Sequence, residues 1–241
     1  MTLKEKLLEE FQHDYKNGLY HLFSCKLAYH SNRIEGSRLS EEQTAFLFET
    51  SEVCQGDNTY VPKDVEEARG HFLMFNHMLK TLSEPLSEDM IKKFHYYLKF
   101  GVFDDIANGR PIGEYKRLPN IVGTLKTAAP KEVPDLMSEL LSWYTGLNNI
   151  TLNELSEFHV RYEEIHPFAD GNGRTGRMIL FRESLLNTDY PIIIDSNVDT
   201  KYKTILSTVQ KNRNFEDLAL FFETQQSEYK EIIDNYLKEI N

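Results

Sequence analysis

Twelve residues at positions 166–177, HPFADGNGRTGR, combine the side chains and the backbone freedom that phosphate chemistry requires. Gly171 and Gly173 let a loop turn tightly and direct successive backbone N–H groups outward. The helix that resumes after them offers its positive N-terminal end, and Arg174 and Arg177 lie three residues apart on one face of it. The stretch therefore predicts an anion site for more than one phosphate. It is not a P-loop, because it does not match GxxxxGK[ST] and no strand precedes it.

The other polar residues of this stretch indicate a group transfer at those phosphates. Asp170 can ligate Mg²⁺ between two phosphates, because this hard cation prefers oxygen. Asn172 can donate a hydrogen bond to a phosphoryl oxygen, and His166, with an ordinary pKa of about 6.5, can accept the proton of an incoming hydroxyl. A lone histidine before proline usually only ends a helix, and a lone GxG usually only makes a turn. A base, a metal ligand, a donor and an anion clamp together predict phosphoryl or nucleotidyl transfer.

The elements that must position this stretch are predicted to be helices. Residues 151–165 have helical spacing, and the pattern ends at His166 because proline disfavours helix in the residue before it. After the glycines, RTGRMILFRESLL resumes the helical pattern. His159, two helical turns before His166, is interpreted as a supporting or core residue rather than a catalytic one.

Helix signals also fill most of the remaining chain. One helix is predicted from the start of the chain to residue 35, with Gly36 as its stop. Two more helical runs occupy 199–240, and the stretch 109–130 is predicted to be a loop with a small hairpin, because glycines, prolines and IVGT interrupt the periodicity. The other helices are predicted from start signals at Ser40, Pro62, Ser87, Pro134 and Thr151. The sequence therefore predicts an all-α fold of one domain.

Composition narrows the classes of partner. The chain has 241 residues, 40% of them hydrophobic, and 27 basic against 38 acidic residues give a net charge of −11. A basic surface for nucleic acid is therefore not expected, and no apolar run approaches the length of a signal core or a membrane span. We expect a soluble cytoplasmic protein with no nucleic-acid or membrane partner. Cys25 and Cys54 lack ligand spacing and are predicted to be reduced, buried thiols.

HPFADGNGRTGR resembles the signature of the Fic family, HxFx[DE]GNGRxxR, at every specified position. The resemblance extends over most of residues 60–225. It implies an all-α Fic-type core with a small β-hairpin flap, ATP as substrate, Mg²⁺ as cofactor, and transfer of AMP to a Tyr, Thr or Ser hydroxyl of a target protein or of the enzyme itself.

The resemblance also implies a role for each residue of the signature. His166 resembles the base that deprotonates the target hydroxyl, and Asp170 resembles the metal ligand. Asn172, with the loop amides of Gly171 and Gly173, resembles the clamp on the α-phosphate. The ligands of the β- and γ-phosphates correspond to Arg174 and Arg177.

Enzymes that transfer other groups have signatures similar to this one, so the identity of the transferred group has to be weighed residue by residue. The Doc branch, which transfers phosphate, has alanine at the position of Gly171 and lysine at that of Gly173, so the two glycines favour AMP transfer. UMP or phosphocholine transfer uses a signature that is hard to distinguish from this one. Tyr202 is a candidate for the base pocket or an ordinary packing residue, and Lys203 follows it where a second tyrosine is common. A non-catalytic module that binds a nucleotide or a partner is the alternative of another class, but it has no need of His166.

The predicted hairpin within GEYKRLPNIVGT, residues 113–124, lies where Fic-family members carry a flap. An exposed strand edge there can receive an extended target segment by backbone pairing, whereas the simpler interpretation is a surface hairpin. The target-docking residues would be Leu118, Asn120, Ile121, Val122 and Gly123. The sequence does not identify the target protein.

A second constellation, SNRIEG at 31–36, resembles the inhibitory motif of the family. Ser31 and Glu35 are four residues apart and share a helix face. A carboxylate that reaches Arg177 would occupy the ligand of the γ-phosphate, which predicts autoinhibition. The sequence leaves open whether that contact forms within one chain or between subunits of a homo-oligomer. We divide the chain into N-terminal helices, 1–59, packed on a catalytic core, 60–241, as one structural domain.

Overall fold

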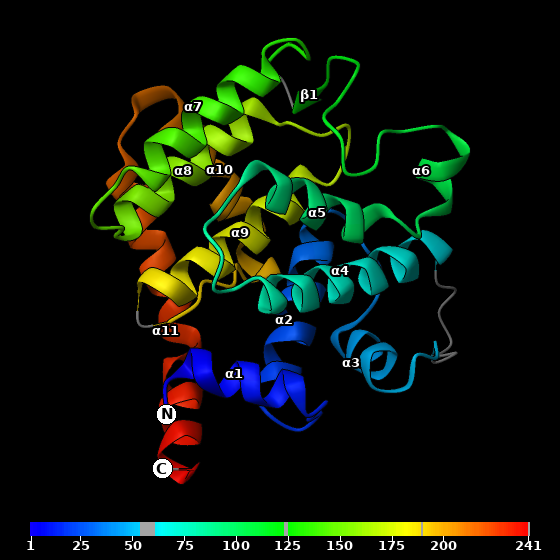
Figure 1. Cartoon of the computed structure of the whole chain (residues 1–241), viewed down its shortest axis with the longest axis vertical. Helices are drawn as coiled ribbons and strands as arrows, with labels where there is room; N and C mark the ends of the chain where they lie inside the picture. The colour runs from blue at the N-terminus through cyan, green and yellow to red at the C-terminus, as the bar shows by residue number, and fades with distance from the viewer. Residues whose placement is uncertain (54–60, 123–124, 189, 241) are drawn as a thin grey trace.

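The computed structural model of the chain describes residues 1–53, 61–122, 125–188 and 190–240, and helices dominate it (Figure 1). This confirms the predicted all-α fold. Cys25 is buried, as predicted, whereas Cys54 lies outside the described residues. In chain order the elements are α1 (Leu3–Gln12), α2 (Leu19–Ile34), α3 (Glu41–Thr50), α4 (Pro62–Lys80), α5 (Glu88–Lys99), α6 (Phe103–Ala107), β1 (Ile121–Val122), β2 (Leu125–Lys126), α7 (Val133–Thr145), α8 (Leu152–Ile165), α9 (Asn172–Asn187), the 3₁₀ turn η1 (Ser196–Val198), α10 (Asp199–Asn212) and α11 (Phe215–Ile240).

Helix α9 lies at the centre of the bundle, and α2, α4, α5 and α8 pack against it (Figure 1). Its side chains are buried on every face over most of its length, which is typical of a core helix rather than an amphipathic surface helix. One cluster of buried apolar side chains runs from Leu3 in α1 to Ile233 in α11. The N-terminal helices therefore share their core with the rest of the chain, and the boundary at residue 59 stays a prediction.

The start of the chain differs from the single helix that periodicity predicts. Helix α1 ends at Gln12, and α2 begins only at Leu19. The buried Glu10 carboxylate accepts the Tyr20 N–H at 2.8 Å and so caps the first turn of α2. Gly18 makes this cap possible, because a Cβ at that position would lie 2.3 Å from the Glu10 carboxylate. A long-range cap of this kind leaves no periodic signal in the sequence.

Local start and stop signals are confirmed at most other helix ends. The Ser40 hydroxyl accepts the Gln43 N–H, and the Ser87 hydroxyl accepts the Met90 N–H. The capping box of Thr151 is also formed at the start of α8. Gly36 has a φ of 94°, which explains why the chain can leave α2 at the predicted stop.

The stretch 109–130 contains little regular structure. Strands β1 and β2 pair antiparallel, with Ile121 opposite Lys126. Two residues per strand form only a short ladder, so a hairpin that acts as a flap stays a prediction. Among the residues that the structure describes, no helix has the length and apolar character of a membrane span.

Helices α4 and α5 approach closely at Gly70, and this contact generates a stability prediction. A Cβ at Gly70 would lie 2.1 Å from the Leu98 carbonyl oxygen. We expect Gly70→Ala to lower the free energy of unfolding by about 1–3 kcal/mol, because overpacking outweighs the roughly 1 kcal/mol of helix propensity that alanine adds. Urea denaturation measures the change. Gly101→Ala is the matched control, because a Cβ there meets no atom within 4 Å. Equal stability of the two variants would contradict the close packing.

Candidate active site

The end of α8 places His166 in an unusual backbone conformation. Its φ of 50° and ψ of 62° lie in the left-handed region, where residues other than glycine are uncommon. The helix ends at the predicted residue, before Pro167. His166 Nδ1 lies 3.7 Å from Glu163 Oε2. Burial alone would raise the pKa of Glu163, but the contact with His166 and the charge of Arg177 lower it, so a buried carboxylate lies beside the imidazole.

Helix α5 supports the loop that follows. The His95 ring stacks on Phe168 with centroids 3.9 Å apart. Its Nδ1 accepts the Gly113 N–H at 2.9 Å, which leaves Nε2 protonated to donate to the Asp170 carbonyl at 3.0 Å. Burial lowers the pKa of His95 to about 4, so the ring is neutral at pH 7. Sequence analysis did not select His95, because its role depends on a contact across 75 positions.

The Asn172 side chain shapes the same loop from the other side. Its Oδ1 accepts the Phe168 N–H at 2.7 Å, and its Nδ2 donates to the Phe168 carbonyl at 2.8 Å. Because the side chain is buried and bonded at both ends, this geometry does not provide the predicted donation from Asn172 to a phosphoryl oxygen. The donors left at this end of α9 are its first backbone N–H groups. Gly171, with a φ of 81°, makes the turn into the helix.

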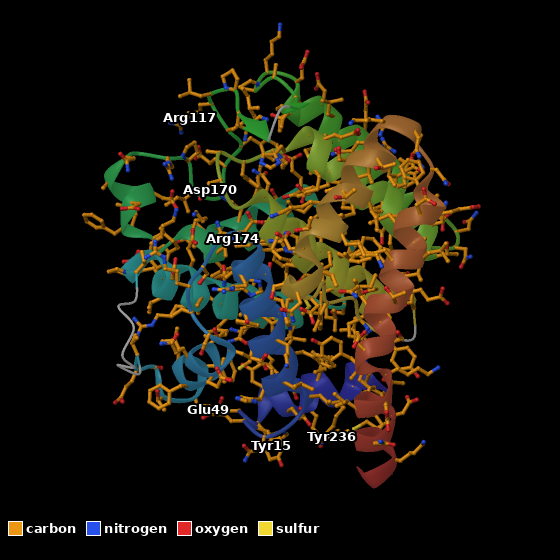
Figure 2. All side chains as sticks on the ribbon, turned by 180° about the vertical axis from the view of Figure 1, so that it is seen from behind. Tyr15, Glu49, Arg117, Asp170, Arg174 and Tyr236 are labelled. Carbon is orange, nitrogen blue, oxygen red and sulfur yellow. The ribbon has the colours of Figure 1, made fainter. Side chains whose placement is uncertain are left out.

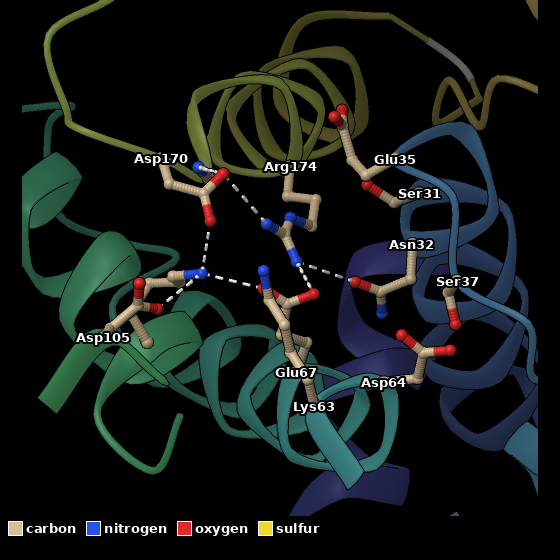
Figure 3. A network of polar contacts seen from close by, with 12 residues as sticks. Ser31, Asn32, Glu35, Ser37, Lys63, Asp64, Glu67, Asp105, Asp170 and Arg174 are labelled. Atoms are coloured by element: carbon tan, nitrogen blue, oxygen red, sulfur yellow. Dashed lines mark hydrogen bonds and ion pairs between the residues drawn. The ribbon is translucent and has the colours of Figure 1, made fainter. Parts of the chain in front are cut away.

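A network of buried charges surrounds Asp170 (Figure 3). The Lys99 ammonium lies 2.7 Å from each of three carboxylates, those of Glu67, Asp105 and Asp170. Arg174 contacts Glu67 Oε2 at 2.5 Å and Asp170 Oδ1 at 3.5 Å. Burial alone would raise the pKa of Asp170, but Arg174 and Lys99 hold it well below its usual range. Asp170 is therefore ionised at any physiological pH.

The donor set around Asp170 fits one hard cation held by a single carboxylate. Oxygens of Glu67, Asp105 and Asp170 lie within 4.8 Å of one another. The Glu67 and Asp105 side chains are buried and bound by Lys99, whereas the Asp170 side chain is 36% exposed. Among the three, only Asp170 presents oxygen to a ligand from solvent, which suits Mg²⁺ bound through one carboxylate and substrate phosphates. Figure 2 shows Asp170 and Arg174 in the half of the molecule away from Tyr15 and Tyr236.

The two arginines of the motif are both buried, and each is paired with a carboxylate. Arg177 donates from Nε to Ser31 Oγ and from Nη2 to the Ser31 carbonyl, both at 2.9 Å. Its Nη2 also lies 2.7 Å from Glu35 Oε1. The contact between Glu35 and Arg177 thus forms within one chain. Gly173 permits it, because a Cβ there would lie 2.4 Å from Glu35 Oε1.

Tyr202 and His159 form a buried pair behind Arg177. The Tyr202 hydroxyl lies 2.6 Å from His159 Nε2, and neither side chain is exposed. Burial lowers the pKa of His159 to about 4. The structure favours the supporting interpretation of His159 and the packing interpretation of Tyr202. The Tyr202 ring is buried, so in this conformation it cannot contact a nucleotide base.

The candidate docking residues divide into two groups. Leu118 and Ile121 are strongly exposed, 78% and 66%. The Asn120 side chain instead turns toward the catalytic loop and donates to the Phe168 carbonyl at 2.9 Å. Nothing is described for Gly123 or for the Val122 side chain.

Five residues of this site were missed by sequence analysis: His95, Lys99, Glu67, Asp105 and Glu163. Four of them come from α4, α5 and α6, far from the motif in sequence. Glu163 had a local signal, because it lies three residues before His166 on the same helix and hence on the same side.

Comparison with known proteins assigns this site to a family. The profile of the Fic/DOC family matches residues 85–182. The chain is 25% identical over 179 residues to protein adenylyltransferase fic-1 of Caenorhabditis elegans, a match that covers 72% of this chain and 34% of that protein. It is 28% identical over 181 residues to protein adenylyltransferase Fic of Drosophila melanogaster, covering 72% and 35%. The matched region thus spans about a third of the length of these relatives.

A solved structure shows the same fold over nearly the whole chain. A Fic-domain-containing signalling protein from Bacteroides thetaiotaomicron superposes with a TM-score of 0.74 at 23% identity, covering 98% of this chain and 95% of that one. The fold, the complete HxFx[DE]GNGRxxR signature and the family match coincide at the loop between α8 and α9. Residues 85–182 therefore match the domain of the Fic/DOC family, and this match contains the loop between α8 and α9.

Proposed function

We propose that this protein is an adenylyltransferase that transfers AMP from ATP to a hydroxyl side chain of a target protein and of itself. One observation carries the proposal. The complete signature is arranged so that His166, partly exposed at the end of α8, and Asp170 lie on one loop before the N-terminus of α9. The names of the relatives, protein adenylyltransferases from C. elegans and D. melanogaster, support the same reaction.

His166 acts as the base in the proposed reaction. The Glu163 carboxylate beside Nδ1 favours the tautomer with its proton on that atom, which leaves Nε2 to accept the proton of the target hydroxyl. The hydroxyl oxygen then attacks the α-phosphorus of ATP, a P–O bond forms, and the bond to pyrophosphate breaks. The first N–H groups of α9 stabilise the charge that develops on the phosphoryl oxygens.

Asp170 would hold Mg²⁺, which neutralises phosphate charge when it is bound. Lys99 and Arg174 keep the Asp170 carboxylate ionised and fixed in place. The carboxylate therefore needs no deprotonation before it binds a cation. Arg174 and Arg177 are the proposed ligands of the β- and γ-phosphates.

Glu35 is proposed to restrain the enzyme within its own chain. Its carboxylate occupies Arg177, which the γ-phosphate needs, so ATP would bind with its α-phosphate turned away from the line of attack. Because Arg177 is buried, the loss of Glu35 leaves an unpaired cation that a phosphate can satisfy.

The first test removes the base. We expect His166→Ala to lower AMP transfer at least 10²-fold, the scale of general base catalysis, while ATP still binds, because the imidazole acts on the target hydroxyl. Labelled ATP with Mg²⁺ and mass spectrometry of the modified protein measure transfer, and calorimetry measures ATP binding. The exposed His13→Ala is the control.

An equal loss of ATP affinity would contradict the role assigned to His166. An added mass other than AMP would show that the donor is different, as with UMP or phosphocholine. Tight ATP binding by the wild type without any transfer would indicate a binding module.

The second test removes the metal ligand. Asp170→Asn keeps the shape of the side chain but removes its charge, so we expect both the activity and its dependence on Mg²⁺ concentration to be lost. Transfer rates across a Mg²⁺ titration provide the measurement, and the exposed Asp104→Asn serves as the control. A variant whose activity still rises normally with Mg²⁺ would show that the metal is held elsewhere.

The third test releases the proposed inhibition. We expect Glu35→Gly to raise self-modification and target modification more than tenfold, about 1.4 kcal/mol in the barrier, without an equal gain in ATP affinity. Glu35→Gln separates charge from backbone effects, because it keeps the length of the side chain and should also be activated. Unchanged rates in both variants at saturating ATP would refute the inhibition and leave the transferase assignment standing.

A further inference from the structure

Lys116 is a buried lysine beside the proposed catalytic base. It lies in the loop between α6 and β1, and only 3% of it is exposed. Burial lowers the pKa of Lys116 to about 8, and among the described residues no charged group shifts it back. A buried ammonium without a counter-ion is costly, so its hydrogen-bond partners must hold it in place.

The Lys116 ammonium has three acceptors for its three protons. It donates to Asn120 Oδ1 and Thr127 Oγ1, both at 2.7 Å, and to the Ile165 carbonyl at 3.2 Å. Asn120 and Thr127 flank the short β1–β2 ladder. The third acceptor is the last residue of α8, directly before His166. The Lys116 side chain therefore joins the residues that flank the ladder to the catalytic loop.

The backbone of Lys116 adds a second contact on the other side of His166. Its N–H donates to the Pro167 carbonyl at 2.8 Å. Lys116 thus bonds the carbonyl groups before and after His166, whose left-handed conformation is strained for a residue other than glycine. Such a conformation persists only where its surroundings determine it. The Asn120 side chain adds a further link to this loop, through the Phe168 carbonyl.

We propose that Lys116 is a positioning residue, which fixes the strained His166 backbone and couples it to Asn120 and Thr127, the residues that flank the β1–β2 ladder. The reaction that it serves is the proposed AMP transfer, so this inference rests on that proposal. Lys116 does not touch substrate, because its ammonium is enclosed by its three acceptors. Its effect falls on the orientation of His166 and hence on the chemical step, not on ATP binding.

A merely structural lysine would behave differently. Its loss would lower the stability of the protein, but in the folded state the catalytic rate and the environment of the His166 ring would stay the same. The two roles therefore separate in measurements made well below the unfolding temperature. Lys116→Met keeps the length of the side chain and removes its three side-chain donors but leaves the backbone N–H that bonds Pro167, whereas Lys116→Arg keeps a cation that can donate to several acceptors.

The experiment compares these variants in the full chain, with the exposed Lys131→Met as the control. We expect Lys116→Met to lower kcat for AMP transfer at least tenfold, with the Kd for ATP changed less than twofold. Lys116→Arg should recover at least a third of the wild-type rate. The NMR signals of the His166 ring, assigned with His166→Ala, should shift or broaden in Lys116→Met but not in Lys131→Met. An unchanged kcat and unchanged ring signals in folded Lys116→Met would overturn the proposal.

A second variant covers the case in which Lys116→Met does not fold. Thr127→Val is nearly isosteric and removes one of the three acceptors, so it should lower kcat at least threefold and shift the His166 signals. Unchanged values would overturn the proposal. The ring signals need no transfer reaction, so they still test the positioning role if wild-type protein transfers no AMP, and that failure would count only against the proposed function.

Discussion

Two buried arginines on the central helix are the constraint on which the site depends. Arg174 and Arg177 point from α9 into the bundle, where an unpaired guanidinium would cost several kcal/mol. Each is therefore matched by a carboxylate from a different helix, Glu67 from α4 and Glu35 from the end of α2. The packing of α2 and α4 against α9 therefore neutralises these charges in addition to burying apolar surface.

The same constraint extends to Asp170 through Lys99. Glu67 is shared by Arg174 and Lys99, and Lys99 in turn binds Asp105 and Asp170. Arg110 closes the network from the surface by contacting Asp105 at 2.8 Å. The network joins three carboxylates to three cations, those of Lys99, Arg110 and Arg174, so it carries little net charge. Asp170 is thereby fixed by a framework that a change at one distant position would disturb.

Local signals in the sequence predicted the parts of this structure that depend on neighbours along the chain. The caps at Ser40 and Thr151, the end of α8 at His166 and the loop–helix order of the motif all rest on contacts within a few residues. Contacts between distant segments could not be predicted this way. The break between α1 and α2 depends on Glu10 reaching over to Tyr20, and the role of Lys99 depends on three separate elements. The sequence predicted that Asn172 donates to a phosphoryl oxygen, because a motif does not reveal that the Phe168 backbone already bonds both ends of its amide.

The two arginine pairs differ in a way that bears on which of them can exchange partners. Glu67 and Arg174 are both buried, with side chains 8% and 3% exposed, so opening that pair would leave two charges in a poorly solvated interior. Glu35 is 38% exposed, and its carboxylate can return to water while an incoming anion takes over Arg177. A phosphate satisfies a guanidinium as well as a carboxylate does, so the proposed exchange at Arg177 would keep the buried cation paired throughout. Gly173 at the second position of α9 leaves the space that the Glu35 carboxylate occupies, because any side chain there would meet that carboxylate. The pair of Arg177 with Glu35 is therefore the one that the fold leaves open to an exchange of partners, whereas the pair of Arg174 with Glu67 stays closed within the framework that fixes Asp170.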